Sequence, residues 1–321
     1  MLSTRYATQA GLAIVGFAAI AILAGPAGAT AAKPETTAAQ PPAAQEDGAY
    51  VGQAKCLTCH EKREYKGTLH GRKADERTPA ATHGCETCHG PGQGHVTGGP
   101  DGGLDTTKIV NPKKLKPQQA SEICVTCHMR GTHTLFTGNQ HDQRNVGCVS
   151  CHSVHNPLGE KQIKAATQPE MCGTCHRNIV NKMNRFNHMP VREGKIVCTS
   201  CHNPHGSANV KLLKTGTTVD EACTSCHSEK RGPYLWEHAP VANSCVTCHD
   251  PHGSNNERLL VAKVPFLCQR CHVTSRHPPT VYEGFGLKNS ASANRMIGQG
   301  CVVCHVQIHG SNAPSGKYFH R

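Results

Sequence analysis

The chain has 321 residues and a formal net charge of +12, with 37% hydrophobic but only 4% aromatic residues. Glycine and proline contribute 32 and 20 residues. An ordinary side-chain core for a chain of this length needs more large apolar residues than this composition supplies. The composition therefore argues against conventional globular domains and predicts that something other than side chains fills the interior.

The N-terminal residues 1–29 have the pattern of a secretory signal peptide. Arg5 supplies the positive start, residues 11–24 are apolar, and Ala27-Gly28-Ala29 forms a small-residue cleavage site. An uncleaved membrane anchor is the alternative, but this apolar stretch is shorter than the roughly 18 to 20 residues that a spanning helix needs. We therefore expect an exported protein with a cleaved signal peptide. Residues 30–49, rich in Ala, Pro and Thr, are predicted to be a flexible tether, and residues 50–321 the folded domain.

All twenty cysteines lie in ten copies of the motif C-x-x-C-H. In an exported protein this number would otherwise suggest ten disulfides. The motif is instead the attachment signature of c-type haem, in which two thiols bond to one porphyrin and the adjacent histidine reaches the iron. Zinc ribbons and redox dithiols also use C-x-x-C, but neither requires the histidine. The sequence therefore predicts ten covalently attached haems, held by Cys56, Cys59, Cys85, Cys88, Cys124, Cys127, Cys148, Cys151, Cys172, Cys175, Cys198, Cys201, Cys223, Cys226, Cys245, Cys248, Cys268, Cys271, Cys301 and Cys304.

The histidine that ends each motif is the expected proximal ligand of the haem iron. These ten residues are His60, His89, His128, His152, His176, His202, His227, His249, His272 and His305. Ten porphyrins would also explain the missing core, because each large apolar ring takes the place of several aromatic or aliphatic side chains.

The remaining thirteen of the 23 histidines follow a repeat. The chain divides into five two-haem repeats, each reading motif, histidine, motif, histidine, and residues 211–223 and 258–268 both carry a basic-Leu-Leu stretch into the next motif. The methionines, which can also ligate haem iron, do not follow this order. The repeat therefore predicts bis-histidine iron with the distal ligands His70, His95, His141, His155, His188, His205, His238, His252, His277 and His309.

The order alone leaves several assignments open. His133 competes with His141, and His83 with His95, whereas His320 at the end of the chain is expected to be exposed. His205 and His252 follow their own motifs so closely that we expect them to ligate a neighbouring haem. We further expect the histidine in the middle of a repeat to serve the following motif's haem, and the one at its end the preceding motif's haem.

The predicted ligand set indicates an electron carrier rather than an enzyme, and no catalytic residue is expected. Two protein ligands close an iron to substrates, and two imidazoles favour a low potential. The alternative is a multihaem oxidoreductase of the nitrite or hydroxylamine type with one open iron. Ten motifs that all end in histidine, with ten distal candidates, weaken that alternative. Haem storage or sensing would not require so regular a series.

The charge of +12 does not support nucleic-acid binding once the haems are included. The mature chain, without Arg5, has a charge of +11. Each ferric haem with two ionised propionates adds about −1, so the oxidised protein is near +1 and the reduced protein near −9. Residues 108–117 (KIVNPKKLKP) remain a local basic patch, which could be a docking surface, a partner for propionates or simply a solvated face.

The sequence resembles the MtrA/DmsE family of periplasmic decahaem c-type cytochromes. The resemblance is carried by residues 189–206, 229–260, 268–284 and 308–316, and with ten motifs and a similar length it covers essentially the whole mature chain. It implies a haem wire, possessing two pentahaem halves, inserted into an outer-membrane β-barrel porin. It also implies periplasmic electron carriers and an outer-surface multihaem cytochrome or terminal reductase as partners, in metal or dimethyl sulfoxide reduction or in iron oxidation. The expected location is the periplasm, in association with the outer membrane.

The predicted fold class is a multihaem cytochrome c that is mostly irregular, with short α-helices and little or no β-sheet. Its shape is expected to follow an extended row of ten haems. The glycine-rich residues 90–105 are predicted to form a flexible loop.

Overall fold

The computed structural model describes residues 48–61, 65, 67–272 and 300–320. All of these residues belong to one compact unit, Pro41–Arg321. The predicted signal peptide, most of the predicted tether and the distal candidate His277 lie outside the described residues.

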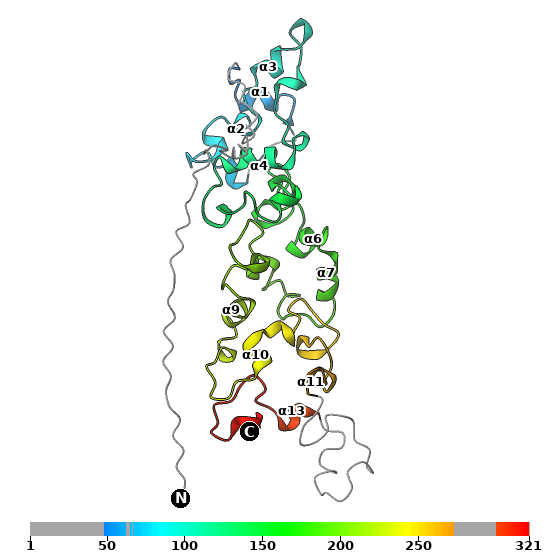
Figure 1. Ribbon diagram of the computed structural model, residues 1–321. Coiled ribbons are helices and arrows are strands. Elements are labelled where there is room, and N and C mark those ends of the chain that lie inside the picture. The colour runs from blue at the N-terminus through cyan, green and yellow to red at the C-terminus, as the bar shows by residue number, and fades with distance from the viewer. Residues whose placement is uncertain (1–47, 62–64, 66, 273–299, 321) are drawn as a thin grey trace, which may run out of the picture. The chain divides into compact units, whose positions relative to one another are not determined.

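Short helices joined by irregular segments make up the described part of the chain, which contains no β-strand (Figure 1). The α-helices are α1 (Gln53–Leu57), α2 (Glu86–His89), α3 (Gln93–Thr97), α4 (Pro117–Val125), α5 (Cys148–Cys151), α6 (Gln168–Gly173), α7 (Arg177–Met183), α8 (Cys198–Cys201), α9 (Val219–Thr224), α10 (Ala239–Asn243), α11 (Phe266–Gln269) and α13 (Cys301–Cys304). The 3₁₀ helices are η2 (Leu69–Gly71), η3 (Pro79–Ala81), η4 (Pro100–Gly102), η5 (Thr106–Lys108), η6 (Pro112–Lys114), η7 (Gly131–His133), η8 (Asp142–Arg144), η9 (Glu160–Gln162), η10 (Val210–Leu212), η11 (Ser228–Lys230), η12 (Cys245–Thr247), η13 (Glu257–Leu259) and η14 (Gly316–Tyr318). The prediction of short helices with little or no sheet is confirmed.

Local sequence signals start the helices that lead into the motifs. The Thr167 hydroxyl accepts a hydrogen bond from the Glu170 backbone N–H, and the Glu170 carboxylate accepts one from the Thr167 N–H. Thr218 and Glu221 form the same capping box at α9. Such boxes satisfy N–H groups that a helix start leaves unpaired. They position α6 and α9 so that the first motif cysteine of repeats 3 and 4 falls in the last turn.

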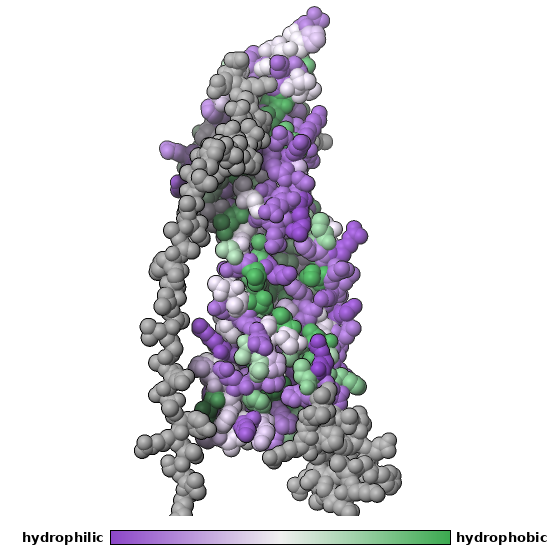
Figure 2. Space-filling view, viewed as in Figure 1, coloured by the Kyte–Doolittle hydropathy of each residue, from purple (hydrophilic) through white to green (hydrophobic). Residues whose placement is uncertain are grey.

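The polypeptide by itself has almost no hydrophobic core. Among the described residues the buried hydrophobic side chains are Tyr65, Ala120, Phe136 and Leu213, and no large side chain is fully buried. Many apolar side chains are exposed instead, and Figure 2 shows hydrophobic patches lying between hydrophilic side chains at the surface. This is the deficit that the composition predicts, and large apolar haem rings are the groups that would cover such patches.

Repeats 2, 3 and 4 share one turn after their second motif. Two consecutive residues in this turn adopt left-handed backbone conformations, with φ between 53° and 61°. An isolated antiparallel bridge then joins the motif histidine to the residue that follows the pair. The left-handed pairs are Lys161-Gln162, Lys211-Leu212 and Arg258-Leu259, and the bridges are His152 to Ile163, His202 to Leu213 and His249 to Leu260. The basic-Leu-Leu stretches seen in the sequence therefore lie at these turns.

The prediction that residues 90–105 form only a loop is wrong in part. This stretch contains α3 and η4. The backbone N–H of Asp105 donates to the carbonyl of His95, and the His95 ring donates back to the carbonyl of Asp105. These two bonds close the glycine-rich stretch into a defined turn. The composition did not reveal this turn, because it depends on a hydrogen bond from the side chain of His95 to the carbonyl of Asp105.

None of the helices in the described ranges has the length and apolar character needed to cross a membrane.

Candidate haem-binding site

Each C-x-x-C-H motif forms a single helical turn. In all ten motifs the backbone N–H of the histidine donates to the carbonyl of the first cysteine, at 2.8 to 3.1 Å. Residues three and four apart in such a turn lie on one side, so both sulfurs and the imidazole can face the same porphyrin. None of the twenty cysteines forms a disulfide, so all are available for thioether bonds to haem.

The two motifs of one repeat lie against each other. Burial and then the neighbouring Cys56 thiol raise the pKa of Cys85 to about 11. In every repeat the first cysteines of the two motifs lie close enough for one to shift the pKa of the other, as the pairs Cys56 and Cys85, Cys124 and Cys148, Cys172 and Cys198, Cys223 and Cys245, and Cys268 and Cys301. The two haem sites of a repeat are therefore adjacent.

Neighbouring repeats meet through their second cysteines. Burial raises the pKa of the Cys88 thiol, and Cys127 of the next repeat adds to the shift. The same relation joins each later repeat to its successor, through Cys151 and Cys175, Cys201 and Cys226, and Cys248 and Cys271. Together with the contacts inside the repeats, these interactions connect all ten attachment sites in the order of the sequence.

The helix before each central repeat's first motif also holds the second motif. The Ser121 hydroxyl of α4 accepts from the Cys148 backbone N–H at 3.1 Å, and the Asp220 carboxylate of α9 accepts from the Cys245 N–H at 2.8 Å. In repeat 3, Gln168 exchanges two hydrogen bonds with Thr199. These side chains satisfy the free N–H groups at the start of the motif turn, so they fix the relative position of the two sites.

The imidazoles are arranged in pairs with a nearly constant separation. Nine pairs have ring centres 5.9 to 6.4 Å apart: His60 and His95, His70 and His128, His89 and His155, His141 and His176, His152 and His205, His188 and His227, His202 and His252, His238 and His272, and His249 and His309. Two imidazoles on opposite sides of one metal ion, with metal–nitrogen bonds of about 2 Å, have ring centres about 6 Å apart. The pairs therefore fit a haem iron between them.

Other histidine rings are too close to a neighbour for an iron to fit. His83 stacks on Tyr50 at 3.9 Å, and the His133 ring lies 4.2 Å from that of His205 and 5.5 Å from that of His128. The geometry therefore favours His95 over His83 and His141 over His133. His320 is exposed, as expected, although its ring lies 4.5 Å from that of His305.

The pairing follows a rule that differs from the one expected from sequence order. A histidine in the middle of a repeat pairs with the first motif of the next repeat, as His141 does with His176. A histidine at the end of a repeat pairs with the second motif of the previous repeat, as His205 does with His152. Among the described pairs, only His60 and His95 lie within one repeat. For the other eight pairs, the expectation that each distal histidine serves a motif of its own repeat is wrong. The order of the sequence does not show how neighbouring repeats pack against each other.

Three glycines allow the reach back to the previous repeat. Gly206, Gly253 and Gly310 each follow an end-of-repeat histidine and have φ values of 118° to 137°. A Cβ atom at Gly206 or Gly253 would overlap with a backbone carbonyl of the previous repeat, and at Gly310 with the Tyr234 ring. Only glycine tolerates both the conformation and the approach.

Backbone carbonyls orient nine of the predicted ligand rings. Nδ1 donates to a carbonyl at 2.6 to 3.0 Å in His89, His95, His141, His152, His188, His202, His238, His249 and His305. This hydrogen bond fixes the tautomer and leaves Nε2 free for a metal. For the second-motif histidine of each central repeat, the acceptor is the carbonyl of the first of the two left-handed residues. The unfavourable backbone conformation therefore places a carbonyl where it can orient the ligand ring.

Burial keeps several distal candidates neutral. Together with the neighbouring His133 and His152, it lowers the pKa of His205 to about 4. Burial also lowers the pKa of His70, His252 and His309. Since only the neutral imidazole ligates iron, these rings are ready to bind at neutral pH.

Sequence reasoning missed the buried carboxylate of Glu86. Its side chain is 3% exposed and accepts three backbone N–H bonds, from Val51, Gly52 and Gly92. Three such donors can stabilise a buried anion without a cation. Tyr65, also buried, donates to Gln53 next to this network. The only signal was an acidic residue inside a C-x-x-C-H motif, where the other nine motifs carry none.

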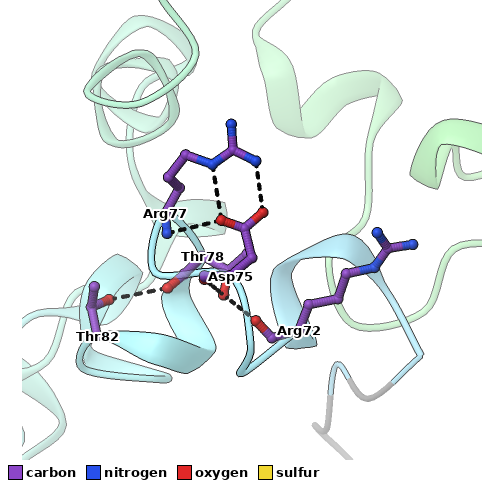
Figure 3. Close-up of polar contacts among 5 residues, drawn as sticks. All are labelled: Arg72, Asp75, Arg77, Thr78 and Thr82. Atoms are coloured by element: carbon purple, nitrogen blue, oxygen red, sulfur yellow. Dashed lines mark hydrogen bonds and ion pairs between the residues drawn. The ribbon is translucent and has the colours of Figure 1, made fainter.

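An exposed ion pair shapes the turn between His70 and the second motif (Figure 3). Arg77 donates from Nε and Nη2 to the two carboxylate oxygens of Asp75, each at 2.9 Å. Thr78 donates to the carbonyls of Arg72 and Asp75, and Thr82 donates to that of Thr78. The hydrogen bonds from Arg77 lower the pKa of Asp75 to about 2. Because the pair is solvated, its role is to define the turn rather than to stabilise the domain.

Comparison with known proteins agrees with this geometry. The doubled CXXCH motif model matches residues 141–181, 188–232 and 238–277, and the cytochrome c554 and c-prime model matches residues 104–153. The chain is 38% identical over 277 residues to the multiheme cytochrome MtrA of Shewanella baltica (strain OS185), which covers 84% of this chain and 81% of the relative. The chain belongs to the MtrA family of multihaem cytochromes. As an MtrA-like protein it binds haem c through its C-x-x-C-H motifs and is an electron carrier, not an enzyme.

Proposed function

We propose that the protein holds ten haems, each with two histidine ligands, and passes electrons along them in the order of the sequence. The observation that carries the proposal is the set of nine histidine pairs with ring centres about 6 Å apart. The hydrogen bonds that hold the second motif of each central repeat to the helix of its first motif, and the histidine pairs that join neighbouring repeats, support the sequential order.

The tenth iron is assigned by elimination. Nine of the ten predicted distal histidines already lie in one of the nine pairs. We assign His277, the remaining distal candidate, to His305. The last repeat would then be closed within itself, as the first repeat is by His60 and His95.

Closed coordination favours electron transfer over catalysis. The protein's side chains would hold each iron from both sides, fix the ring planes and exclude substrates, while the bound haem supplies the one-electron chemistry. Electron tunnelling falls off exponentially with distance, so the adjacency of successive attachment sites is the property that permits conduction.

We further propose that the exported chain works in the periplasm as a wire across the outer membrane, inside a porin partner. It would exchange electrons with periplasmic carriers and with an outer-surface multihaem cytochrome or terminal reductase, in extracellular metal or dimethyl sulfoxide reduction or in iron oxidation. A bilayer with its headgroups is about 40 to 45 Å thick, too far for one tunnelling step, and large outer-membrane barrels have a lumen that accommodates a plug. Membership of the MtrA family supports this role.

The ligand assignment is tested by His252→Ala in the holoprotein, with His133→Ala as the control. His252→Ala should keep ten haems but open the iron of the Cys198–His202 motif, adding a high-spin signal and binding of one carbon monoxide. His133→Ala should remain wholly low-spin. Carbon monoxide binding to the unmodified protein, or its absence from His252→Ala, would contradict the assignment. Co-purification of a porin and an outer-surface cytochrome from outer membranes tests the wire role separately.

A further inference from the structure

We propose that Lys108, Lys113, Lys114 and Lys116, here called the lysine surface, dock an acidic electron-transfer protein at the first repeat. The inference rests on the proposed function and adds to it the contact site and the charge of the partner. No acidic residue occurs between Asp105 and Glu122 in the sequence, so four positive charges occupy this segment without compensation along the chain.

The lysine surface is accessible. All four side chains are exposed, and they lie on η5, on η6 and just before α4. None of their ammonium groups forms an ion pair with any part of the chain that the structure describes. The nearest carboxylate in the sequence, that of Asp105, accepts instead from the backbone and hydroxyl of Thr107. The charges are therefore available to a partner.

The same segment is fixed to the first two haem sites. The Asp105 carbonyl accepts from Nδ1 of His95 at 2.9 Å, and the Val110 carbonyl accepts from Nδ1 of His89 at 2.7 Å. The backbone N–H groups of Asp105 and Val110 donate back to the carbonyls of the same two histidines. The Lys108 stem also lies against Gly94 of α3. A protein bound to the lysine surface would therefore sit next to the ligands of the two haems that begin the series.

Charge selects the partner. The oxidised holoprotein is close to neutral and becomes negative on reduction, so an uncompensated group of four positive charges is a local exception. Such a patch steers oppositely charged proteins and raises their association rate. Electron-transfer encounters use small and short-lived interfaces, which four lysines suffice to guide. The expected occupant is a small acidic protein with an exposed redox centre.

The docking should depend on redox state. Each electron that arrives at the two haems of repeat 1 removes one positive charge next to the lysine surface. The attraction for an acidic partner therefore weakens on reduction, which releases the partner after transfer.

The test compares two variants of the holoprotein with the same change in net charge. One carries Lys108→Glu, Lys113→Glu, Lys114→Glu and Lys116→Glu. The control carries Lys195→Glu, Lys214→Glu, Lys230→Glu and Lys263→Glu, which alter four exposed lysines outside repeat 1. Stopped-flow reduction is followed with two donors, an acidic plant-type ferredoxin as the protein probe and reduced riboflavin as a small probe with at most one charge, each over a range of ionic strength.

The first variant should be reduced by ferredoxin at least about tenfold more slowly than the control variant at low ionic strength. Added salt should slow the unmodified protein and speed the first variant. Reduction by riboflavin should be the same in all three proteins. In addition, ferredoxin should bind the oxidised unmodified protein more tightly than the reduced one.

Equal ferredoxin rates in the two variants would overturn the docking proposal. A lower riboflavin rate or shifted haem potentials in the first variant alone would also overturn it, since the lysines would then belong to the haem pockets as partners of propionates. Both results leave the electron-carrier role intact. Failure of both donors to reduce the unmodified protein would instead contradict the proposed function.

Discussion

The first repeat and the central repeats reach the same haem ligation by different means. In repeats 2, 3 and 4 the second-motif histidine donates to a carbonyl nine residues further along, in the shared left-handed turn. In repeat 1, His89 donates to Val110, 21 residues away. Repeat 1 also contains the buried Glu86 and Tyr65. Repeat 1 therefore relies on buried side chains of its own, where each central repeat packs against the repeat before it.

The ligand pairs show the same contrast. His205 and His252 each connect two repeats, whereas His95 closes repeat 1 within itself. In the ligation that we propose, metal–ligand bonds between repeats would take over part of the role that a hydrophobic core has in other domains.

The largest expected effect comes from removing a histidine that pairs with a histidine of another repeat. His205→Ala and His95→Ala should each open one iron and bind one carbon monoxide. Only His205→Ala removes a connection between repeats, so its melting temperature, followed by the Soret band, should fall further than that of His95→Ala. Equal melting temperatures would show that ligand bonds between repeats do not hold the domain together.

A second prediction concerns the glycines that bring repeats into contact. Gly253→Ala should destabilise the protein by more than about 2 kcal/mol, because the new Cβ meets the Lys182 carbonyl and strains a backbone with φ of 137°. Gly194→Ala is the matched control, since Gly194 has φ of 69° but open space around it. It should cost about 1 kcal/mol. Thermal unfolding measured by circular dichroism compares the two; a similar loss in both would mean that the close contact is unimportant.

The smallest of the three effects is confined to repeat 1. Glu86→Gln keeps the shape of the side chain but replaces a charged acceptor of three N–H groups by a neutral one, which should cost about 1 to 2 kcal/mol. Denaturant unfolding should show this loss with the haem content unchanged. Glu221→Gln, at an exposed helix cap of a central repeat, should lose less. If the two variants lose equally, the buried network of repeat 1 is not a substitute for a preceding repeat.

Some of the structure was predictable because its causes are local. The motif turns, the absence of disulfides among the twenty cysteines, the short helices and the lack of a side-chain core follow from residues four apart or from overall composition. The choice between His133 and His141 did not follow, because both lie in the same stretch of repeat 2 and only packing against repeat 3 separates them. Glu86 was missed because its three donors come from two other segments of the chain.

The sequence by itself determined where each haem is attached, since one helical turn contains all the atoms that make the covalent bonds and the first ligand bond. Only the tertiary structure decided which second histidine faces nine of those sites in the described part of the chain. That choice depends on glycines, carbonyls and turns supplied by adjacent repeats, and the spacing of residues within one repeat holds no information about the distance to another.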